Sequence, residues 1–259
     1  MNKLFKYKIL YLNMFDLSNK KILIFGGTGE LMGTIALGLN KQNAQVIIIG
    51  RDGNKAQKII KDTNIDFFMF DILNDNLDIL FQQIYKKYDN IDFLINGAGV
   101  NSATPLLSIQ NEEINEIFEI NFNFVVKCCQ LYIRNTLDLN VKGKILNIGS
   151  VSGINPLSKV FMYSASKAAL HNFSKNISRE YGNRGILTNI LVPGFFPAEQ
   201  NKQILSKKRT EMIFSQTPMN RFGESNELIG MVSLLASDES SFINGSELVI
   251  DGGYCVTKI

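Results

Sequence analysis

The sequence predicts an α/β fold in which a seven-stranded parallel sheet is covered by helices on both faces. Three observations lead to this prediction: short apolar runs alternate with longer segments of helical spacing, each run is continuous rather than alternating, and no linker or repeat divides the 259 residues. Continuous runs of Ile, Val, Leu and Phe are typical of strands buried on both faces. Repeated strand–helix–strand units imply one doubly wound domain with right-handed crossovers.

The predicted elements follow one another along almost the whole chain. The candidate strands are residues 21–26, 45–50, 66–70, 91–96, 144–149, 186–192 and 247–250. Clear helical spacing is found between them at residues 31–41, 111–137 and 161–181. We expect the domain to cover residues 14–259, with residues 1–13 as a poorly ordered arm and Met14 as a candidate for the natural start.

The composition excludes several classes of protein. Apolar residues make up 45% of the chain, charged residues make up 20%, and the formal net charge is +3. These are values of an ordinary globular domain, and so small a basic excess argues against a nucleic-acid-binding protein. No uninterrupted apolar run reaches the roughly 18 residues that indicate a membrane-spanning helix. We therefore expect neither a nucleic-acid partner nor a membrane partner.

The scarcity of histidine and cysteine narrows the chemistry. The chain has one histidine, His171, which we expect on a helix surface, and three cysteines, Cys128, Cys129 and Cys255. This supply is too small for a zinc site or a Ser-His-Asp triad, so we expect no metal. Thiols used as small apolar residues are typical of a reducing compartment, which predicts a cytoplasmic protein. Acid–base chemistry then falls to a carboxylate, a lysine or a tyrosine.

A glycine-rich turn follows the first predicted strand. Four glycines lie within residues 26–33, immediately before a predicted helix. Glycines allow the backbone to approach a pyrophosphate, whose charge is stabilised by the N–H groups at a helix N-terminus. The position of this turn is that of a Rossmann-type dinucleotide site. We expect cofactor contacts from Gly26, Thr28, Gly29 and Leu31.

The end of the second predicted strand bears on the choice of cofactor. An acidic side chain at this tip would bind the adenosine ribose hydroxyls and favour NAD. The tip is instead Gly50, followed by Arg51, and an arginine can pair with the 2′-phosphate of NADP. We therefore prefer NADP, while Asp52, which could reach back toward the ribose, keeps NAD open.

Tyr163 and Lys167 form the candidate proton-transfer pair. They stand at i and i+4 of a predicted helix, so their side chains share one face. A nearby ammonium is expected to lower the pKa of Tyr163 from its usual value of about 10, which suits a general acid or base. Ser150, at the end of the fifth predicted strand, can hold a substrate oxygen by a hydrogen bond.

The chain resembles the short-chain dehydrogenases/reductases from Phe15 onward. The motifs that carry the resemblance are the glycine turn, Asp71, the segment 96–99, Asn121, Ser150, the pair Tyr163 and Lys167, and Pro193 with Gly194. The resemblance implies an NAD(P)-dependent oxidoreductase that moves a hydride between nicotinamide and a secondary alcohol or ketone. In such an enzyme Tyr163 exchanges a proton with the substrate oxygen, which Ser150 orients. Lys167 holds the nicotinamide ribose and tunes Tyr163, and Asn121 supports a water relay.

The resemblance also implies further cofactor contacts. Asp71 and Ile72 would contact adenine, and Asn96 and Ala98 would line the adenosine and ribose side. The other implied contacts are Tyr163, Lys167, Pro193 and Phe196. The chain departs from the family pattern at the glycine turn, where Phe25 replaces a threonine and Glu30 and Met32 replace glycines, and at Ala198, where many members carry a threonine that binds the cofactor.

The substrate end is similar to the branch of D-mannonate oxidoreductases and gluconate dehydrogenases, which act on sugar acids or polyols. We expect a lid at about residues 195–215, in which Glu199, Gln200 and Asn201 bind hydroxyls. Carboxylate attraction would come from Lys207, Lys208, Arg209 or Arg221, although lysines facing solvent explain the same charges. A 3-oxoacyl-carrier reductase is the alternative enzyme, and a non-catalytic NAD(P)-binding regulator is the alternative of another class. By resemblance we expect a homotetramer or dimer.

Overall fold

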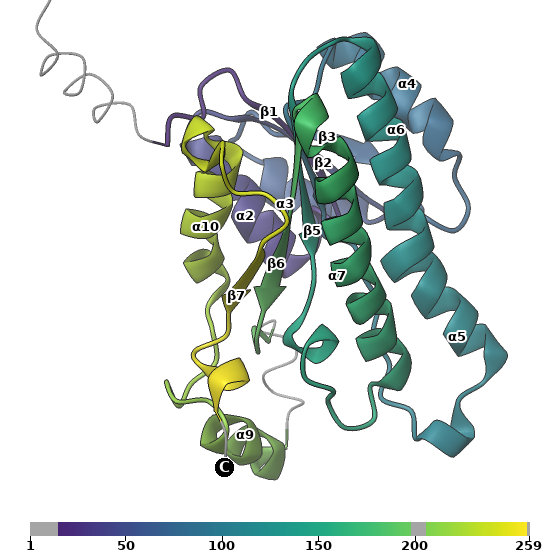
Figure 1. Cartoon of the computed structure of the whole chain (residues 1–259), viewed down its shortest axis with the longest axis vertical. Coiled ribbons are helices and arrows are strands. Elements are labelled where there is room, and N and C mark those ends of the chain that lie inside the picture. The colour runs from purple at the N-terminus through teal and green to yellow at the C-terminus, as the bar shows by residue number, and fades with distance from the viewer. Residues whose placement is uncertain (1–14, 198–205, 258–259) are drawn as a thin grey trace, which may run out of the picture.

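Seven parallel strands form one sheet in the order β3-β2-β1-β4-β5-β6-β7 (Figure 1). The computed structural model describes residues 15–197 and 206–257, so the expected arm at residues 1–13 lies outside the described residues. The predicted seven-stranded parallel sheet is confirmed, and each strand begins and ends within two residues of its predicted limits. The strands are β1 (Lys21–Phe25), β2 (Gln45–Gly50), β3 (Asp66–Met69), β4 (Phe93–Asn96), β5 (Gly143–Ile148), β6 (Ile186–Pro193) and β7 (Glu247–Ile250).

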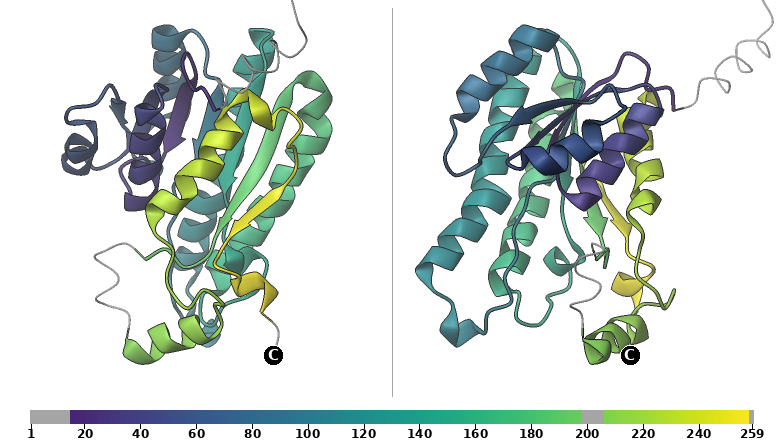
Figure 2. Two further views of the ribbon diagram at one scale, coloured as in Figure 1. Left: turned by 90° about the vertical axis from the view of Figure 1, so that its left-hand side faces the viewer. Right: turned by 180° about the vertical axis from the view of Figure 1, so that it is seen from behind.

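Helices cover both faces of this sheet, as the two views of Figure 2 show. Residues of α2, α3 and α10 pack against one face, and residues of α4, α6 and α7 pack against the other. The helices are α2 (Glu30–Lys41), α3 (Gly53–Ile60), α4 (Leu77–Tyr88), α5 (Asn111–Phe118), α6 (Phe124–Asp138), α7 (Phe161–Tyr181), α9 (Lys207–Ser215) and α10 (Ile229–Ala236). Short 3₁₀ turns are η1 (Leu106–Ser108), η3 (Val151–Gly153), η4 (Gly182–Arg184), η5 (Ser225–Leu228), η6 (Asp238–Ser240) and η7 (Tyr254–Val256).

The two helical layers explain why the strand sequences are continuously apolar. In β1, Ile22 and Ile24 belong to the core cluster on the α2 face, whereas Leu23 and Phe25 belong to the cluster on the α4 face. All four side chains are buried because successive residues of a strand point to opposite faces. A strand between two helical layers therefore needs apolar residues at every position.

The helix expected over residues 111–137 is interrupted near its middle. α5 ends at Phe118, a π turn named η2 (Glu119–Asn123) follows, and α6 begins at Phe124. A π turn adds a residue to the helical spacing, and such turns are frequent at functional sites. Asn121 lies within this turn and is fully buried.

The expectation that His171 lies on a helix surface is wrong. His171 is 4% exposed, and it belongs to the face of α7 that packs against the end of β5. The prediction failed because this buried face contains polar as well as apolar residues, a pattern that is typical of a partly solvent-exposed helix face. The buried residues of α7 are Ser166, Lys167, Leu170, His171, Ser174 and Ile177.

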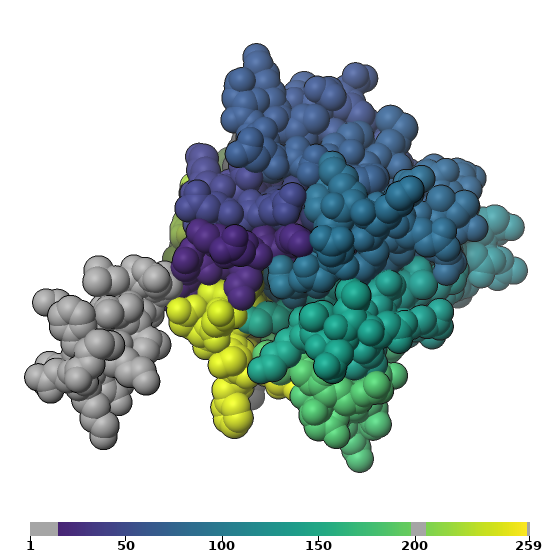
Figure 3. Space-filling model, turned by 90° about the horizontal axis from the view of Figure 1, so that it is seen from above, coloured from purple at the N-terminus to yellow at the C-terminus, as the bar shows by residue number. Residues whose placement is uncertain are grey.

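All seven strands are parallel, so their carboxyl ends lie along one edge of the sheet, and β6 points to the lower side in Figure 1. Figure 3 looks onto the opposite end, where segments from purple to yellow lie side by side. In a doubly wound sheet, ligands bind outside the carboxyl ends of the strands, at the point where the strand order reverses. Here that point lies between β1 and β4.

Candidate active site

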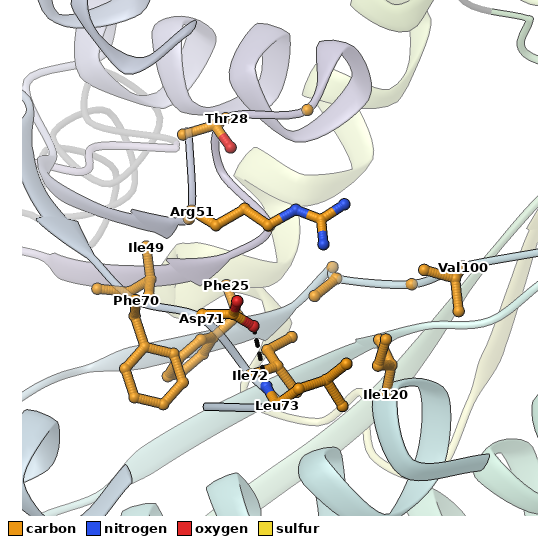
Figure 4. Close-up of a pocket in the computed structure, with 16 residues that line it drawn as sticks. Phe25, Thr28, Ile49, Arg51, Phe70, Asp71, Ile72, Leu73, Val100 and Ile120 are labelled. Carbon is orange, nitrogen blue, oxygen red and sulfur yellow. Dashed lines mark hydrogen bonds between the residues drawn. The ribbon is translucent and has the colours of Figure 1, made fainter. Parts of the chain in front are cut away.

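A crevice opens at the carboxyl ends of β1, β2, β3 and β4 (Figure 4). Backbone of the glycine turn and of residues 97–99 lines it together with apolar side chains, among them Ile49, Phe70 and Ile120. The structure brings seven of the expected cofactor-binding residues to this crevice. They are Gly26, Thr28, Gly29, Arg51, Asp71, Ile72 and Ala98.

The glycine turn is shaped by close contacts between backbones. Gly26 has a positive φ of 77°, and a side chain there would meet the backbone nitrogen of Ala98 at 2.7 Å. A Cβ on Gly27 would lie 2.5 Å from Cβ of Ile48. Leu31, also expected as a contact, packs instead against the apolar core on the α2 face. The side of the turn that faces Ala98 and Ile48 is therefore filled, and a ligand has room only on the side that faces the crevice.

Arg51 and Asp71 face the crevice from the ends of β2 and β3. Figure 4 shows the Arg51 side chain extending over the crevice, on the same side as Asp71. The Asp71 carboxylate accepts hydrogen bonds from the Leu73 N–H at 3.0 Å and from Asn74 Nδ2 at 2.9 Å. These bonds, together with the nearby charge of Arg51, lower the pKa of Asp71.

Asp52 has a different role from the one considered for it. Its Oδ1 accepts the Lys55 N–H at 3.0 Å, so the carboxylate caps the N-terminus of α3. Gly50, at the tip of β2, has no space for a side chain because a Cβ there would collide with the hydroxyl of Thr28. The side chain from this tip that lines the crevice is therefore Arg51.

A second hollow, here called the outer pocket, lies at the ends of β5 and β6. Ser150 and Tyr163 line it, and Asn101 and Arg209 are the other polar residues in its lining. Its apolar lining comes from Val151, Leu157, Val160, Phe195, Phe196, Pro197, Ile213 and Phe222. The expected lid residues 198–205 lie outside the described residues, so Ala198, Glu199, Gln200 and Asn201 are not placed.

The pKa of Tyr163 moves in the direction opposite to the one expected. Burial raises it above the ordinary value of 10.0, and a hydrogen bond with Ser150 opposes this shift. The Lys167 ammonium lies 5.7 Å from the centre of the Tyr163 ring, but it donates a hydrogen bond to the Ile148 carbonyl at 2.7 Å. Burial also lowers the pKa of Lys167 to about 8, so the positive charge near the phenol is lost as pH rises above that value.

Ser150 is held in a turn rich in hydrogen bonds. Its backbone is extended, and its Oγ accepts from the Ser152 N–H at 3.2 Å. The Ser152 hydroxyl lies 3.1 Å from the same oxygen. Ser150 also lines the outer pocket together with Tyr163, so the turn after β5 and the first turn of α7 meet there.

Asn121 ties the π turn to the loop that follows β4. Its Oδ1 accepts from the Val100 N–H at 2.8 Å, and its Nδ2 donates to the Val100 carbonyl at 2.9 Å and to Ser166 Oγ at 3.1 Å. A Cβ on Gly99 would lie 3.3 Å from Asn121 Oδ1 and 3.6 Å from Lys167 Nζ, so both side chains reach the same glycine. Asn121 and Lys167 are therefore neighbours at the crevice wall.

Asn96, expected on the adenosine and ribose side, has its side chain in the core. The residue is 2% exposed, and its Nδ2 donates to Asn147 Oδ1 at 2.8 Å and contacts the Cys129 sulfur at 3.5 Å. Its amide thus joins β4 to β5 inside the core, so it is not available as a side-chain ligand. Pro193 is buried at the end of β6, and Phe196 faces the outer pocket rather than the crevice.

Sequence reasoning missed several residues of the site. Asn101 could have been found, since it follows β4 at the edge where ligands bind. Phe222 reaches the outer pocket from a distant loop, for which the sequence holds no local signal.

The described residues hold no cluster of three or more His, Cys, Asp or Glu side chains suited to a metal ion. Over the same residues, no helix has both the length and the apolarity to cross a membrane.

The fold and the crevice beside a serine–tyrosine–lysine group define a dinucleotide-binding oxidoreductase class. A family model described as Enoyl-(Acyl carrier protein) reductase matches residues 33–255. L-xylulose reductase of Caenorhabditis elegans is 31% identical over 93% of this chain and 97% of its own length. The chain belongs to the short-chain dehydrogenase/reductase family and is an oxidoreductase that acts on CH–OH groups.

Further comparisons give relatives with different substrates and cofactors. A 3-oxoacyl-[acyl-carrier-protein] reductase of Rickettsia conorii is 31% identical over 93% of this chain and 98% of its own length. The crystal structure of a gluconate 5-dehydrogenase from Burkholderia cenocepacia, in complex with NADP and tartrate, has a TM-score of 0.89 at 27% identity, covering 96% of this chain and 100% of that one. A Haemophilus influenza protein with bound NAD, proposed to be a D-mannonate oxidoreductase, has a TM-score of 0.86 at 28% identity, covering 94% and 97%.

The role of Asn121 can be tested by removing its side chain. Asn121→Ala deletes three hydrogen bonds to Val100 and Ser166, which should loosen the crevice wall and weaken NADPH binding by about ten-fold or more. Titration calorimetry measures this. Asn123→Ala is the matched control, because Asn123 lies in the same π turn but is exposed and bonded to Glu119. Equal affinities for the two variants would contradict the assignment.

Proposed function

We propose that the chain catalyses hydride transfer between a nicotinamide cofactor and a secondary alcohol or ketone, with Tyr163 as the general acid or base. The observation that carries this proposal is that Ser150 and Tyr163 lie together in the lining of the outer pocket, where Ser150 influences the pKa of Tyr163, next to a crevice suited to a dinucleotide. The glycine backbone, the apolar walls and Arg51 fit the pyrophosphate, adenine and ribose parts of such a cofactor. When bound, the cofactor would supply or accept the hydride.

The residues of the chain then divide the remaining work. The Tyr163 phenol is protonated at neutral pH, since its ordinary pKa is about 10 and burial raises it further, so it can donate its proton to a ketone oxygen. Ser150 orients that oxygen by a hydrogen bond. Lys167, whose pKa of about 8 lies near neutrality, supports proton exchange with Tyr163, and Asn121 lies beside Lys167. The reverse sequence of proton transfers serves alcohol oxidation.

The proton-transfer role is tested by Tyr163→Phe. Loss of the hydroxyl should lower kcat by a factor of roughly 100 to 10,000, the usual contribution of a positioned acid or base, while NADPH affinity stays within about two-fold. Steady-state kinetics and fluorescence titration measure the two effects. Tyr181→Phe, at the far end of α7, should behave as wild type. A Tyr163→Phe enzyme with near-normal kcat would overturn the mechanism.

We further propose that NADP is preferred over NAD. Asp52, the residue that favoured NAD, is engaged in capping α3, whereas Arg51 lines the crevice at the tip of β2. Among the described residues, none accepts a hydrogen bond from the Arg51 guanidinium, which leaves its donors available to a 2′-phosphate. Solved relatives bind NADP in one case and NAD in the other, so either cofactor is compatible with the fold.

Cofactor preference is tested by Arg51→Ala. Loss of a charge-assisted contact to the 2′-phosphate should raise the Kd of NADPH by roughly 10- to 100-fold and change the Kd of NADH by less than about two-fold. Lys58→Ala, on the exposed side of α3, is the control for a simple change in surface charge. Equal losses for the two nucleotides would refute the preference.

For the substrate we propose a sugar acid or polyol. The outer pocket offers polar groups from Asn101, Ser150 and Tyr163 to hydroxyls, and Arg209 is a cation in the lining of the described pocket. Names of relatives, L-xylulose reductase and gluconate 5-dehydrogenase, agree with this class. A 3-oxoacyl-carrier reductase is the second candidate, because Lys207 and Lys208 are exposed at the start of α9, beside the pocket, where an acidic carrier could dock.

The two candidate substrates predict different mutational effects on α9. If a free carboxylate binds in the pocket, Arg209→Met should raise KM for sugar acids by about ten-fold or more, while Lys207→Met has little effect. If an acyl carrier docks, the Lys207→Met and Lys208→Met double variant should lose carrier-linked activity and its salt dependence. A panel of sugar acids, polyols and acyl carriers, followed at the nicotinamide absorbance, separates the outcomes.

We also propose that the chain self-associates as a dimer or homotetramer. A hollow between α6 and α7 is lined mainly by apolar and aromatic residues, and Phe242, which precedes β7, is fully exposed. Exposed apolar patches of this kind are typical of interfaces between subunits.

A further inference from the structure

His171 is the buried titratable residue for which the proposed reaction has no use. It is the only histidine of the chain, and it follows Tyr163 and Lys167 at successive intervals of four residues along α7. Residues with this spacing share one face of a helix. His171 therefore follows Tyr163 and Lys167, the proposed proton-transfer residues, along the same face of α7. It is 4% exposed.

The contacts of the imidazole define its protonation. The Ser150 N–H donates to His171 Nε2 at 3.3 Å, which requires a lone pair on that nitrogen. The proton of the neutral ring is then on Nδ1, which lies 3.4 Å from Glu247 Oε1. The same carboxylate oxygen lies 2.5 Å from Lys175 Nζ, so Glu247 contacts two side chains of α7. The result is a chain of contacts from β7 through His171 to the backbone of Ser150.

The turn that carries Ser150 is built around this ring. A Cβ on Gly149 would collide with His171 Nε2, and a Cβ on Gly153 would lie 3.2 Å from His171 Cε1. Glycines on both sides of Ser150 thus leave the space that the imidazole occupies. Because Ser150 and Tyr163 line the outer pocket together, a shift of this turn would change the position of Ser150 relative to the reacting phenol.

We propose that His171, held by Glu247, is a positioning residue that fixes Ser150 through its backbone N–H and makes the activity fall at acid pH. The proposal rests on the role of Ser150 in the proposed function. Protonation of His171 would place a donor on Nε2 opposite the Ser150 N–H donor, and the hydrogen bond would be lost.

The surroundings favour the neutral ring at physiological pH. Burial is the largest cause that lowers the pKa of His171, and the ammonium groups of Lys167 and Lys175 on α7 act in the same direction. Glu247 on β7 opposes them, and the segment 149–153 carries no charged side chain. The active form is therefore present above the ordinary histidine pKa of about 6.5 and is lost as pH falls through the lower value in the folded protein.

The first test measures the tautomer and the protonation of the His171 imidazole directly. Since the chain has one histidine, a long-range ¹H–¹⁵N spectrum of the untagged full chain, labelled at histidine, contains one ring system. We expect a protonated Nδ1 and an unprotonated Nε2 at pH 7, a titration midpoint below about 6.5, and a changed spectrum in Glu247→Gln. A proton on Nε2, or a midpoint at or above about 6.5, would overturn the proposal.

The second test reads the effect on Ser150. His171→Leu removes the acceptor and should lower kcat by about ten-fold, equivalent to about 1.4 kcal/mol, with the KM of the nicotinamide cofactor unchanged. His171→Gln, whose Oε1 can accept the Ser150 N–H but does not titrate, should recover most of kcat and lose the acid limb of the pH profile. Asn172→Leu, exposed on the same helix, is the control. A His171→Gln profile that keeps the wild-type acid limb would refute the positioning role.

The two tests also separate this proposal from the proposed function. If Tyr163→Phe remains active but the spectrum shows the Nδ1–H tautomer, the reaction assignment fails and the contact chain stands. If the spectrum shows the other tautomer while Tyr163→Phe is inactive, the positioning role fails and the reaction assignment stands. Melting temperatures of the His171 variants identify any loss of kcat that follows from unfolding, in which case His171→Gln decides.

Discussion

The site depends on the burial of a polar helix face against the end of a strand. α7 turns Lys167, His171 and Ser174 toward β5, and each has a hydrogen-bond partner there: the Ile148 carbonyl, the Ser150 N–H and the Asn147 amide. A buried polar group without a partner costs free energy, so these bonds set the position of the helix along the strand. The same position brings Tyr163 to Ser150. Under the proposed function, packing and catalysis thus share one set of contacts.

Glycine is the means by which backbones and side chains approach closely enough. At Gly26 the turn after β1 touches the backbone after β4, and at Gly99 the loop after β4 touches Asn121 and Lys167. At Gly149 the turn after β5 makes space for an imidazole. Each of these positions would clash or crowd if a side chain were added. Glycines at the edge where all strands end therefore determine the shape of the crevice and of the outer pocket.

The ionisable groups of the site fall into two sets, a buried pair proposed for proton transfer and exposed cations proposed for ligand choice. The buried pair Tyr163 and Lys167 has pKa values shifted toward the neutral forms, which keeps a proton on the phenol and makes the ammonium easier to deprotonate. Under the proposed function, cofactor and substrate choice depend instead on exposed cations, Arg51 at the tip of β2 and Arg209 on α9. Exposed residues can be exchanged at little cost to the fold, which is consistent with relatives of similar architecture and different substrates.

The sequence by itself determined the sheet, because strands between two helical layers must be apolar at every residue. It also determined which residues could act together through local spacing, such as Tyr163 and Lys167 one helical turn apart. Only the tertiary structure decided what depends on distant residues. Asn96 turned from the crevice into the core because Asn147 offers a partner 51 positions away. His171 is buried because Ser150 and Glu247 converge on it from two strands. The pKa of Tyr163 rises because burial, which no local pattern reports, outweighs the opposing effect of Ser150, and the Lys167 ammonium is bonded to the Ile148 carbonyl.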